Sequence, residues 1–303
     1  MKIVHTFIPH GYSEENAPME KYRTIGMILS CALAKKYYDK VELYTTEEVA
    51  SYVTSLNIPY TDIKILPSTA QTNAGLFSIP KLYTFMEQTE PFIHIDIDTF
   101  LFEPLNEFRF GTTTFSHRDA NHINNLSSLQ GYYTSYAEPI WGIKDELPDW
   151  YTSINLGEVP NMNLVVAKNL TEIQEATEQA LNIYFKYKAH WDKYPAAAAT
   201  IEQLGVFAAM RHYGYDVSYY FNKNPSGISV VGNTLVFNTA SSHAPQHTEF
   251  NTITQVREIN NFNYGGYLHT SGYWLRNKDL LTILKRRIVK EGYADVLALI
   301  DLY

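Results

Sequence analysis

The stretch "FIHIDIDTFLFEPL", residues 92 to 105, decides the fold prediction for this chain. It opens with β-branched and aromatic residues, typical of a buried strand, and sets two carboxylates, Asp96 and Asp98, at the end of that strand. At a period of two both side chains lie on the same side, about 7 Å apart, or closer if the strand ends in a turn. Like charges this close need a cation, and a divalent ion that prefers oxygen ligands, Mn²⁺ or Mg²⁺, would supply it.

Two other hypotheses remain for this pair of aspartates. In the first, the strand simply ends and both carboxylates are solvated. In the second, Asp96 is the nucleophile of a phosphatase-type DxDx[TV] motif. The threonine, however, directly follows Asp98, and Phe100 occupies the position where that motif requires Thr or Val. The phosphohydrolase is therefore the less favoured alternative.

The residues before this stretch alternate between strand and helix patterns. The expected strands are residues 2–8, 40–45, 62–67 and 91–98, and the expected helices are 23–38, 46–57 (opened by Thr46) and 78–88. This alternation predicts a parallel, doubly wound α/β sheet. The two aspartates then lie at the carboxyl end of the fourth strand, on the edge where open α/β sheets bind ligands.

Beyond residue 105 the regular alternation ends. We expect strands at 112–118 and 162–168, helices at 170–191 and 200–214 (N-capped by Thr200), a hairpin over 227–238 and a helical tail over 277–303. No internal repeat or linker is visible, and we therefore expect a single domain that spans residues 1–303. Its parts are a nucleotide-binding half (1–118), an acceptor and sugar half (119–275) and a C-terminal helical segment (276–303).

Composition excludes several classes of function. Asp and Glu number 32 against 24 Lys and Arg, a formal net charge of −8, and no basic block is present, which argues against nucleic acid as a partner. The one cysteine, Cys31, stands among apolar residues and can form neither an intramolecular disulfide nor a cysteine-based zinc site. With no transmembrane stretch and no signal-peptide pattern, we expect a cytoplasmic protein.

Three segments together resemble the GT-A glycosyltransferases, in particular the glycogenin-like retaining enzymes with a DxD motif. The first is the stretch above, whose matching residues are Asp96, Asp98, Thr99, Pro104, Leu105, Glu107 and Phe108. The second is "SIPKLYTF", with Ser78 and Lys81. The third is "YLHTSGYWLRNK", residues 267–278, where His269 and Gly272 match an HxxG signature.

This resemblance implies a GT-A fold, which is Rossmann-like with a mostly parallel central sheet and helices on both faces, here followed by a C-terminal helical tail. It further implies a metal-dependent hexosyltransferase that uses a nucleotide-diphosphate sugar, a UDP-sugar first of all, with retention. The cofactor would be Mn²⁺ or Mg²⁺, and an imidazole beside two carboxylates suits Mn²⁺ better. The acceptor is an unknown glycan, lipid-linked or protein molecule.

The resemblance also assigns roles to residues. The metal ligands would be Asp96, Asp98 and His269. The expected contacts to the nucleotide sugar are His5, Thr6, Phe7, Thr45, Ser78, Lys81, Asp96, Ile97, Asp98, Asn163, Gly272 and Lys278. Glu202 and Gln203 would lie near the reacting sugar as catalytic residues, with Glu202 as the carboxylate nucleophile to test if a covalent intermediate forms.

The chain departs from the family pattern in two places. After Gly272 the family has a lysine and then Pro-Trp, whereas this chain has Arg276 and Lys278 at other spacings; Asn163 is followed by Leu164 instead of a small residue. These departures leave a second hypothesis open: a nucleotide- or glycan-binding protein on the same fold with weak or no catalysis.

Overall fold

A computed structural model gives the fold of the chain. It describes residues 1–8, 17–70, 78–118, 139–140, 142–154, 158–194, 197–221, 227–231, 234–239, 251–253, 267–270 and 278–301. These residues form two compact units that interleave along the chain. The first comprises Met1–Ile65, Ile95–Phe108 and Pro225–Tyr303, and the second comprises Leu66–His94 and Arg109–Asn224.

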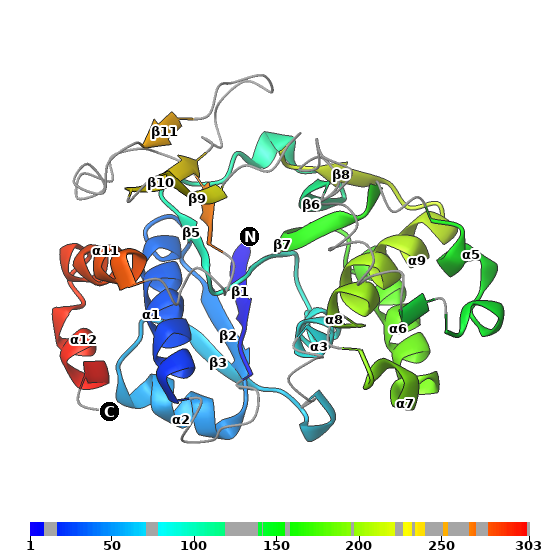
Figure 1. The fold of residues 1–303 in the computed structure, drawn as a ribbon, viewed down its shortest axis with the longest axis horizontal. Coiled ribbons are helices and arrows are strands. Elements are labelled where there is room, and N and C mark those ends of the chain that lie inside the picture. The colour runs from blue at the N-terminus through cyan, green and yellow to red at the C-terminus, as the bar shows by residue number, and fades with distance from the viewer. Residues whose placement is uncertain are drawn as a thin grey trace. The chain divides into compact units, whose positions relative to one another are not determined.

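The first unit contains the first three strands of the chain, which are parallel, together with the N-terminal and C-terminal helices (Figure 1). Its elements are β1 (Lys2–Thr6), α1 (Ala17–Ala34), β2 (Val41–Thr45), α2 (Glu47–Ser55), β3 (Asp62–Ile65), β5 (Thr99–Leu101), β9 (Gly227–Val231), β10 (Thr234–Thr239), β11 (Asn251–Ile253), β12 (Tyr267–His269), α11 (Lys278–Lys290) and α12 (Ala294–Asp301). The strand order is β3-β2-β1, all parallel, with β5 and β12 forming an antiparallel pair of their own and β11-β10-β9 an antiparallel sheet.

The second unit contains four paired strands and a group of helices. Its elements are η2 (Ser68–Ala70), α3 (Ile79–Met86), β4 (Phe92–Ile95), β6 (Thr113–Arg118), η6 (Lys144–Glu146), α5 (Asp149–Thr152), β7 (Pro160–Ala167), α6 (Leu170–Lys186), α7 (Lys188–Trp191), α8 (Ala197–Ala199), the π-helix η8 (Thr200–Gly205), α9 (Val206–His212) and β8 (Val217–Tyr219), with η4 (Glu107–Arg109) at the boundary. Here the strand order is β4-β7-β6-β8. β6 is parallel to β8 and antiparallel to β7.

The C-terminal helices complete the core of the first unit. In α11 the apolar residues Leu280, Leu284 and Ile288 recur every four positions and are buried, so they form one face of the helix. This helix lies against α1, as Figure 1 shows. The ion pairs of Glu291, just after α11, with Arg287 and with Lys36, just after α1, add polar contacts at the same place.

The predicted α/β fold with a mostly parallel sheet and a helical C-terminal segment is confirmed. Thr46 is the N-cap of α2, where its hydroxyl accepts a hydrogen bond from the Val49 amide. Cys31 is buried, as its apolar neighbours predict. None of the helices in the described residues has the length and apolar character needed to cross a membrane. The division into a single domain with three parts stays a prediction.

The expected helix 23–38 is observed as Ala17–Ala34, and two local predictions close to candidate site residues were wrong. The strand expected over residues 91–98 ends at Ile95, and the two aspartates lie in the turn that follows. Thr200 is not an N-cap, because helical structure already begins at Ala197, and Ala199 has helical backbone angles. The strand ends early because the amide of Thr99 donates a hydrogen bond to the carbonyl of Asp96, which closes a turn.

Candidate active site

The two aspartates are brought together by a tight turn. The amide of Thr99 donates a hydrogen bond to the carbonyl of Asp96 at 2.9 Å, which closes a four-residue turn between β4 and β5. A turn shortens the separation that an extended strand would give to the carboxylates. This is the second of the two geometries expected from the sequence.

His269 reaches the aspartates because β12 pairs with β5. The pairing is antiparallel, with His269 opposite Thr99 and Leu268 opposite Phe100. Just beyond the pair, Thr270 donates two hydrogen bonds to the carbonyl of Asp98, from its amide at 3.0 Å and from its hydroxyl at 3.1 Å. Strand pairing therefore joins two segments that are far apart in sequence and anchors the backbone of Asp98.

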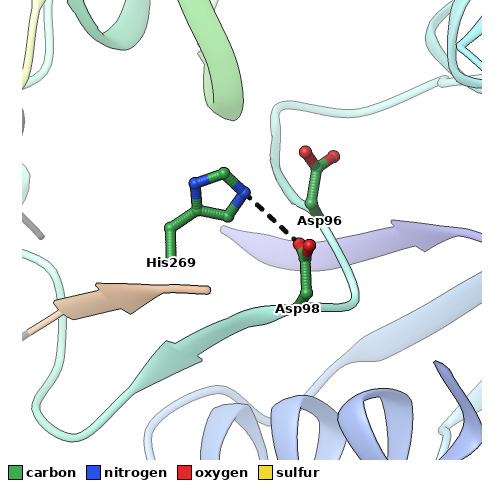
Figure 2. A group of neighbouring side chains, drawn as sticks. All are labelled: Asp96, Asp98 and His269. Carbon is green, nitrogen blue, oxygen red and sulfur yellow. Dashed lines mark ion pairs between the residues drawn. The ribbon is translucent and has the colours of Figure 1, made fainter. Parts of the chain in front are cut away.

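The three side chains converge in the first unit, as Figure 2 shows. Nε2 of His269 lies 3.5 Å from Oδ1 of Asp98. One ligand atom from each of Asp96, Asp98 and His269 lies within 4.8 Å of the other two. Asp98 is buried, whereas Asp96 and His269 are half-buried. Access from solvent and convergence of the ligand atoms are both requirements of an exchangeable metal site.

The donor set fits a divalent cation. Ligands of an octahedral ion at about 2.1 Å lie about 3.0 Å apart when adjacent and about 4.2 Å apart when opposite. The 3.5 Å between His269 and Asp98 lies between these two values, and the other ligand atoms are within 4.8 Å of one another. Two carboxylates and one imidazole suit Mn²⁺ somewhat better than Mg²⁺. The three residues predicted as metal ligands are thus brought together.

The residues predicted to contact the nucleotide follow β1 and β2 in the same unit. Thr6 is half-buried at the end of β1, and Phe7 and Thr45 are buried. The Thr45 hydroxyl donates to the carbonyl of Phe7, and the Phe7 amide donates to the carbonyl of Tyr44 at 3.0 Å. These bonds hold the carboxyl ends of the two parallel strands together. The contacts themselves stay predictions.

His5 has a different environment from the one expected of a nucleotide contact. Its ring is fully buried and bonded at both nitrogens: Nδ1 to the hydroxyl of Tyr60 at 2.8 Å and Nε2 to the hydroxyl of Ser30 at 3.2 Å. Burial lowers the pKa of His5 to about 3, because the protonated ring would be charged in an apolar interior. The imidazole is therefore neutral at physiological pH.

In the second unit, Lys81 and Glu202 form a buried ion pair. Nζ of Lys81, in α3, lies 2.6 Å from Oε1 of Glu202, in η8, and their side chains are only 10% and 4% exposed. Lys81 also donates to the carbonyl of Met162 in β7 at 3.1 Å. One ammonium group thus joins three elements. A carboxylate paired this closely is compensated in charge and held in one orientation.

The helix that presents Glu202 is unusual. Residues Thr200–Gly205 form a π-helix, a widened turn that is rare and often found at functional sites. Its last residue, Gly205, packs tightly against the neighbouring helices: an added Cβ would lie 3.2 Å from the Cβ of Ala180 and 3.4 Å from the ring of Tyr151. Tyr151 also donates to the carbonyl of Thr200 at 3.0 Å. These contacts fix the position of the segment that contains Glu202.

The other predicted residues of the second unit lie around this pair. Ser78, just before α3, and Asn163, next to Met162 in β7, are buried, while Gln203 follows Glu202 and is half-buried. In the first unit, Lys278 is the first residue of α11 and is exposed. Gly272 lies outside the described residues, as does Arg276. Their roles, like those of Ile97 and Gln203, stay predictions.

The sequence did not predict that Thr270, Ser30 and Tyr60 hydrogen-bond to residues of the site or to His5. Thr270 directly follows His269, so a hydroxyl beside a suspected ligand was the available signal. Ser30 is a polar residue within the apolar run of α1, which also called for a partner. Nothing in the pattern around Tyr60 indicated its bond to His5.

Comparisons with known proteins match one family model and distant solved structures, including the following three. A family model described as "Family of unknown function (DUF6734)" matches residues 1–300. No curated protein matches the chain. Among solved structures, an active-site mutant of LgtC has 11% sequence identity and a TM-score of 0.39, over 73% of this chain and 74% of that one.

Two further structures are similarly distant. Mouse xyloside xylosyltransferase 1, in its apo form, has 10% identity and a TM-score of 0.36, over 71% of this chain and 84% of that one. The glycosyltransferase GlyE of Streptococcus pneumoniae has 9% identity and a TM-score of 0.34, over 66% and 43%. By name, both proteins are glycosyltransferases. At these TM-scores the likeness assigns no activity, substrate or metal to this chain.

Proposed function

We propose that the chain, which belongs to a family of unknown function (DUF6734), is a metal-dependent glycosyltransferase. It would move a hexose from a nucleotide-diphosphate sugar, with UDP as the nucleotide to test first, onto a glycan, lipid-linked or protein acceptor with retention of configuration. The observation that supports the proposal most is the convergence of Asp96, Asp98 and His269 within 4.8 Å.

The chemistry requires such a site because a diphosphate gains negative charge as it departs. A divalent ion between the three side chains would bind the diphosphate oxygens and neutralise that charge. Asp96 and Asp98 supply the negative ligands, both from the turn that the Thr99 amide closes, and their carboxylates converge within 4.8 Å. His269 completes the set from a paired strand, so the site forms only when the first unit is folded.

The proposal gives the second unit's ion pair a supporting role. Lys81 compensates the charge of Glu202 at 2.6 Å, and a carboxylate paired with an ammonium group is a weaker nucleophile than one without such a partner. We therefore favour Glu202 as a group that stabilises positive charge on the reacting sugar over one that forms a covalent bond to it. Chemical rescue separates the two roles: in Glu202→Ala, azide would yield a glycosyl azide only if Glu202 were the nucleophile.

The test of the proposed function is calorimetric titration of the protein with UDP in the presence and absence of Mn²⁺. We expect binding that depends on Mn²⁺ in the parent chain and is lost in Asp98→Ala. Asp62→Asn is the matched control, because this carboxylate lies on β3 in the same unit and its side chain is 56% exposed. Metal-independent binding, or binding that Asp98→Ala leaves intact, would rule the proposal out.

A product assay then separates an enzyme from a binding protein. With Mn²⁺ and a panel of UDP-sugars, slow hydrolysis of the donor is expected even without the acceptor, because water can take its place. Tight binding with no release of UDP from any donor would instead support the binding-protein alternative. Phosphate release from an aryl phosphate, abolished in Asp96→Asn, would support the phosphohydrolase.

A further inference from the structure

A chain of four hydrogen-bonded groups runs through the interior of the first unit. The hydroxyl of Tyr60 lies 2.8 Å from Nδ1 of His5, Nε2 of His5 lies 3.2 Å from Oγ of Ser30, and that Oγ donates to the carbonyl of Thr99 at 2.6 Å. His5, Ser30 and Thr99 are fully buried. The groups come from four segments, β1, α1, β5 and the chain that precedes β3.

Counting the protons that each group can donate gives the direction of every hydrogen bond in this series. A serine hydroxyl has one proton, and Ser30 gives it to the carbonyl of Thr99, which can only accept. The bond between Ser30 and His5 must then be donated by Nε2–H of His5. A neutral imidazole has one N–H, so Nδ1 accepts from the hydroxyl of Tyr60. The low pKa of His5, which results from burial, agrees with this neutral tautomer.

The series of hydrogen bonds ends at Thr99, the residue that follows Asp98. The amide of Thr99 closes the turn to Asp96, its carbonyl accepts from Ser30, and its strand position is opposite His269. Thr99 is therefore bonded to the backbone of one predicted metal ligand, adjacent in sequence to a second, and paired across the strands with the third. A shift of this one peptide would move all three ligand atoms relative to one another.

We propose that Tyr60, His5 and Ser30 are positioning residues that hold the backbone at Thr99 so that Asp96, Asp98 and His269 keep the spacing a divalent cation needs. This inference rests on the proposed function. Together with Thr270, which donates twice to the carbonyl of Asp98, the relay of Tyr60, His5 and Ser30 holds consecutive carbonyls of the ligand-bearing turn from two different segments. Groups behind metal ligands commonly set affinity in this way.

The purely structural alternative is that the relay only satisfies buried polar groups. That role predicts lost stability in every variant and no specific effect on metal binding. The two roles are separated by measuring Mn²⁺ affinity, through the electron paramagnetic resonance signal of free Mn²⁺ and without nucleotide, next to urea denaturation of the metal-free protein.

Three variants change the relay by degrees. Ser30→Ala removes the donor to Thr99, and we expect about a tenfold weaker Mn²⁺ affinity. His5→Leu leaves that donor in place without its incoming bond, so a smaller loss of about threefold is expected. His5→Gln should restore near-parent affinity, because an amide N–H can take the place of Nε2–H. The control is Ile28→Val, a buried change in the same helix that destabilises without touching the relay.

The outcomes are distinct. If the parent chain binds Mn²⁺ and Ser30→Ala binds it equally well, or if Ile28→Val weakens it as much, the relay does not position the ligands while the proposed function stands. Failure of His5→Gln to exceed His5→Leu would also overturn the inference. If the parent chain binds no Mn²⁺ at all, the proposed function fails and the role of the relay toward a metal fails with it.

Discussion

The two units treat buried carboxylates in opposite ways. In the second unit, Glu202 is compensated by Lys81 of the same chain at 2.6 Å, and both are almost fully buried. In the first unit, Asp96 and Asp98 lie beside His269, a residue that becomes a metal ligand in its neutral form, and two of the three are half-buried. The comparison teaches that one acid is compensated by a basic side chain of the fold, whereas the other two converge with a histidine at a position that solvent reaches, as the proposed metal site requires.

The largest effect is expected at the solvent-accessible cluster. Asp98→Ala should lower turnover of the nucleotide sugar by about 10³-fold or more, since about 4 kcal/mol of transition-state stabilisation is lost with a metal ligand. The metal-free variant should be as stable as the parent chain, because one of two mutually repelling carboxylates is gone. Donor hydrolysis and urea denaturation measure the two quantities. A variant that keeps its turnover would remove the contrast between the units.

Breaking the ion pair should act on stability instead. Lys81→Met leaves Glu202 buried without its ammonium partner, and we expect the free energy of unfolding to fall by about 3 to 5 kcal/mol. The double variant Lys81→Met/Glu202→Leu should recover much of that loss, because no buried charge remains. Urea denaturation of both variants checks this. Equal losses in the two would indicate that the hydrogen bond from Lys81 to the carbonyl of Met162, which both variants lack, is the main contribution.

Metal binding should stabilise the chain only through Asp96, Asp98 and His269. At a free Mn²⁺ concentration of about 100 times Kd the free energy of unfolding should rise by about 2.7 kcal/mol. The gain should vanish in Asp98→Ala and persist in Glu202→Gln, which retains a hydrogen-bonding side chain of the same shape. Thermal denaturation with and without Mn²⁺ gives the comparison, and loss of the gain in Glu202→Gln would show that the two sites are coupled.

The smallest effect concerns acid pH and His5. Burial lowers its pKa in the folded chain to about 3, from a usual value of 6.5. Below pH 6.5 the unfolded chain takes up a proton that the folded chain does not, so stability from this group falls as pH falls, by about 1.4 kcal/mol per unit. Between pH 6.5 and 5 the parent chain should lose about 1.7 kcal/mol more than His5→Gln, because the full slope is reached only well below pH 6.5.

Urea denaturation across that pH range measures the difference, and subtraction of the two curves cancels the other histidines. Tyr60, the titratable group bonded to His5, stays neutral throughout, because burial raises its pKa well above the usual value of 10. Parallel curves for the two proteins would mean that His5 is protonated in the folded state, contrary to the tautomer that the relay requires.

By itself, the sequence determined most of the helices and strands, and it showed which strands end in polar side chains. The alternation before residue 92 predicted the parallel sheet, Thr46 was recognisable as a cap, and Asp96 and Asp98 were visible as acids after an apolar run. These features depend on short-range periodicity and capping, which a local pattern records. The resemblance to a known motif added His269, although no local pattern distinguishes it from a loop histidine.

Only the tertiary structure decided which of those groups meet. His269 reaches Asp98 through strand pairing, Lys81 reaches Glu202 across helices, and His5 proved to be an internal bonding group. The physical reason is that ladder hydrogen bonds and burial join residues far apart in the chain, and their energies depend on the assembled interior, not on neighbours in sequence.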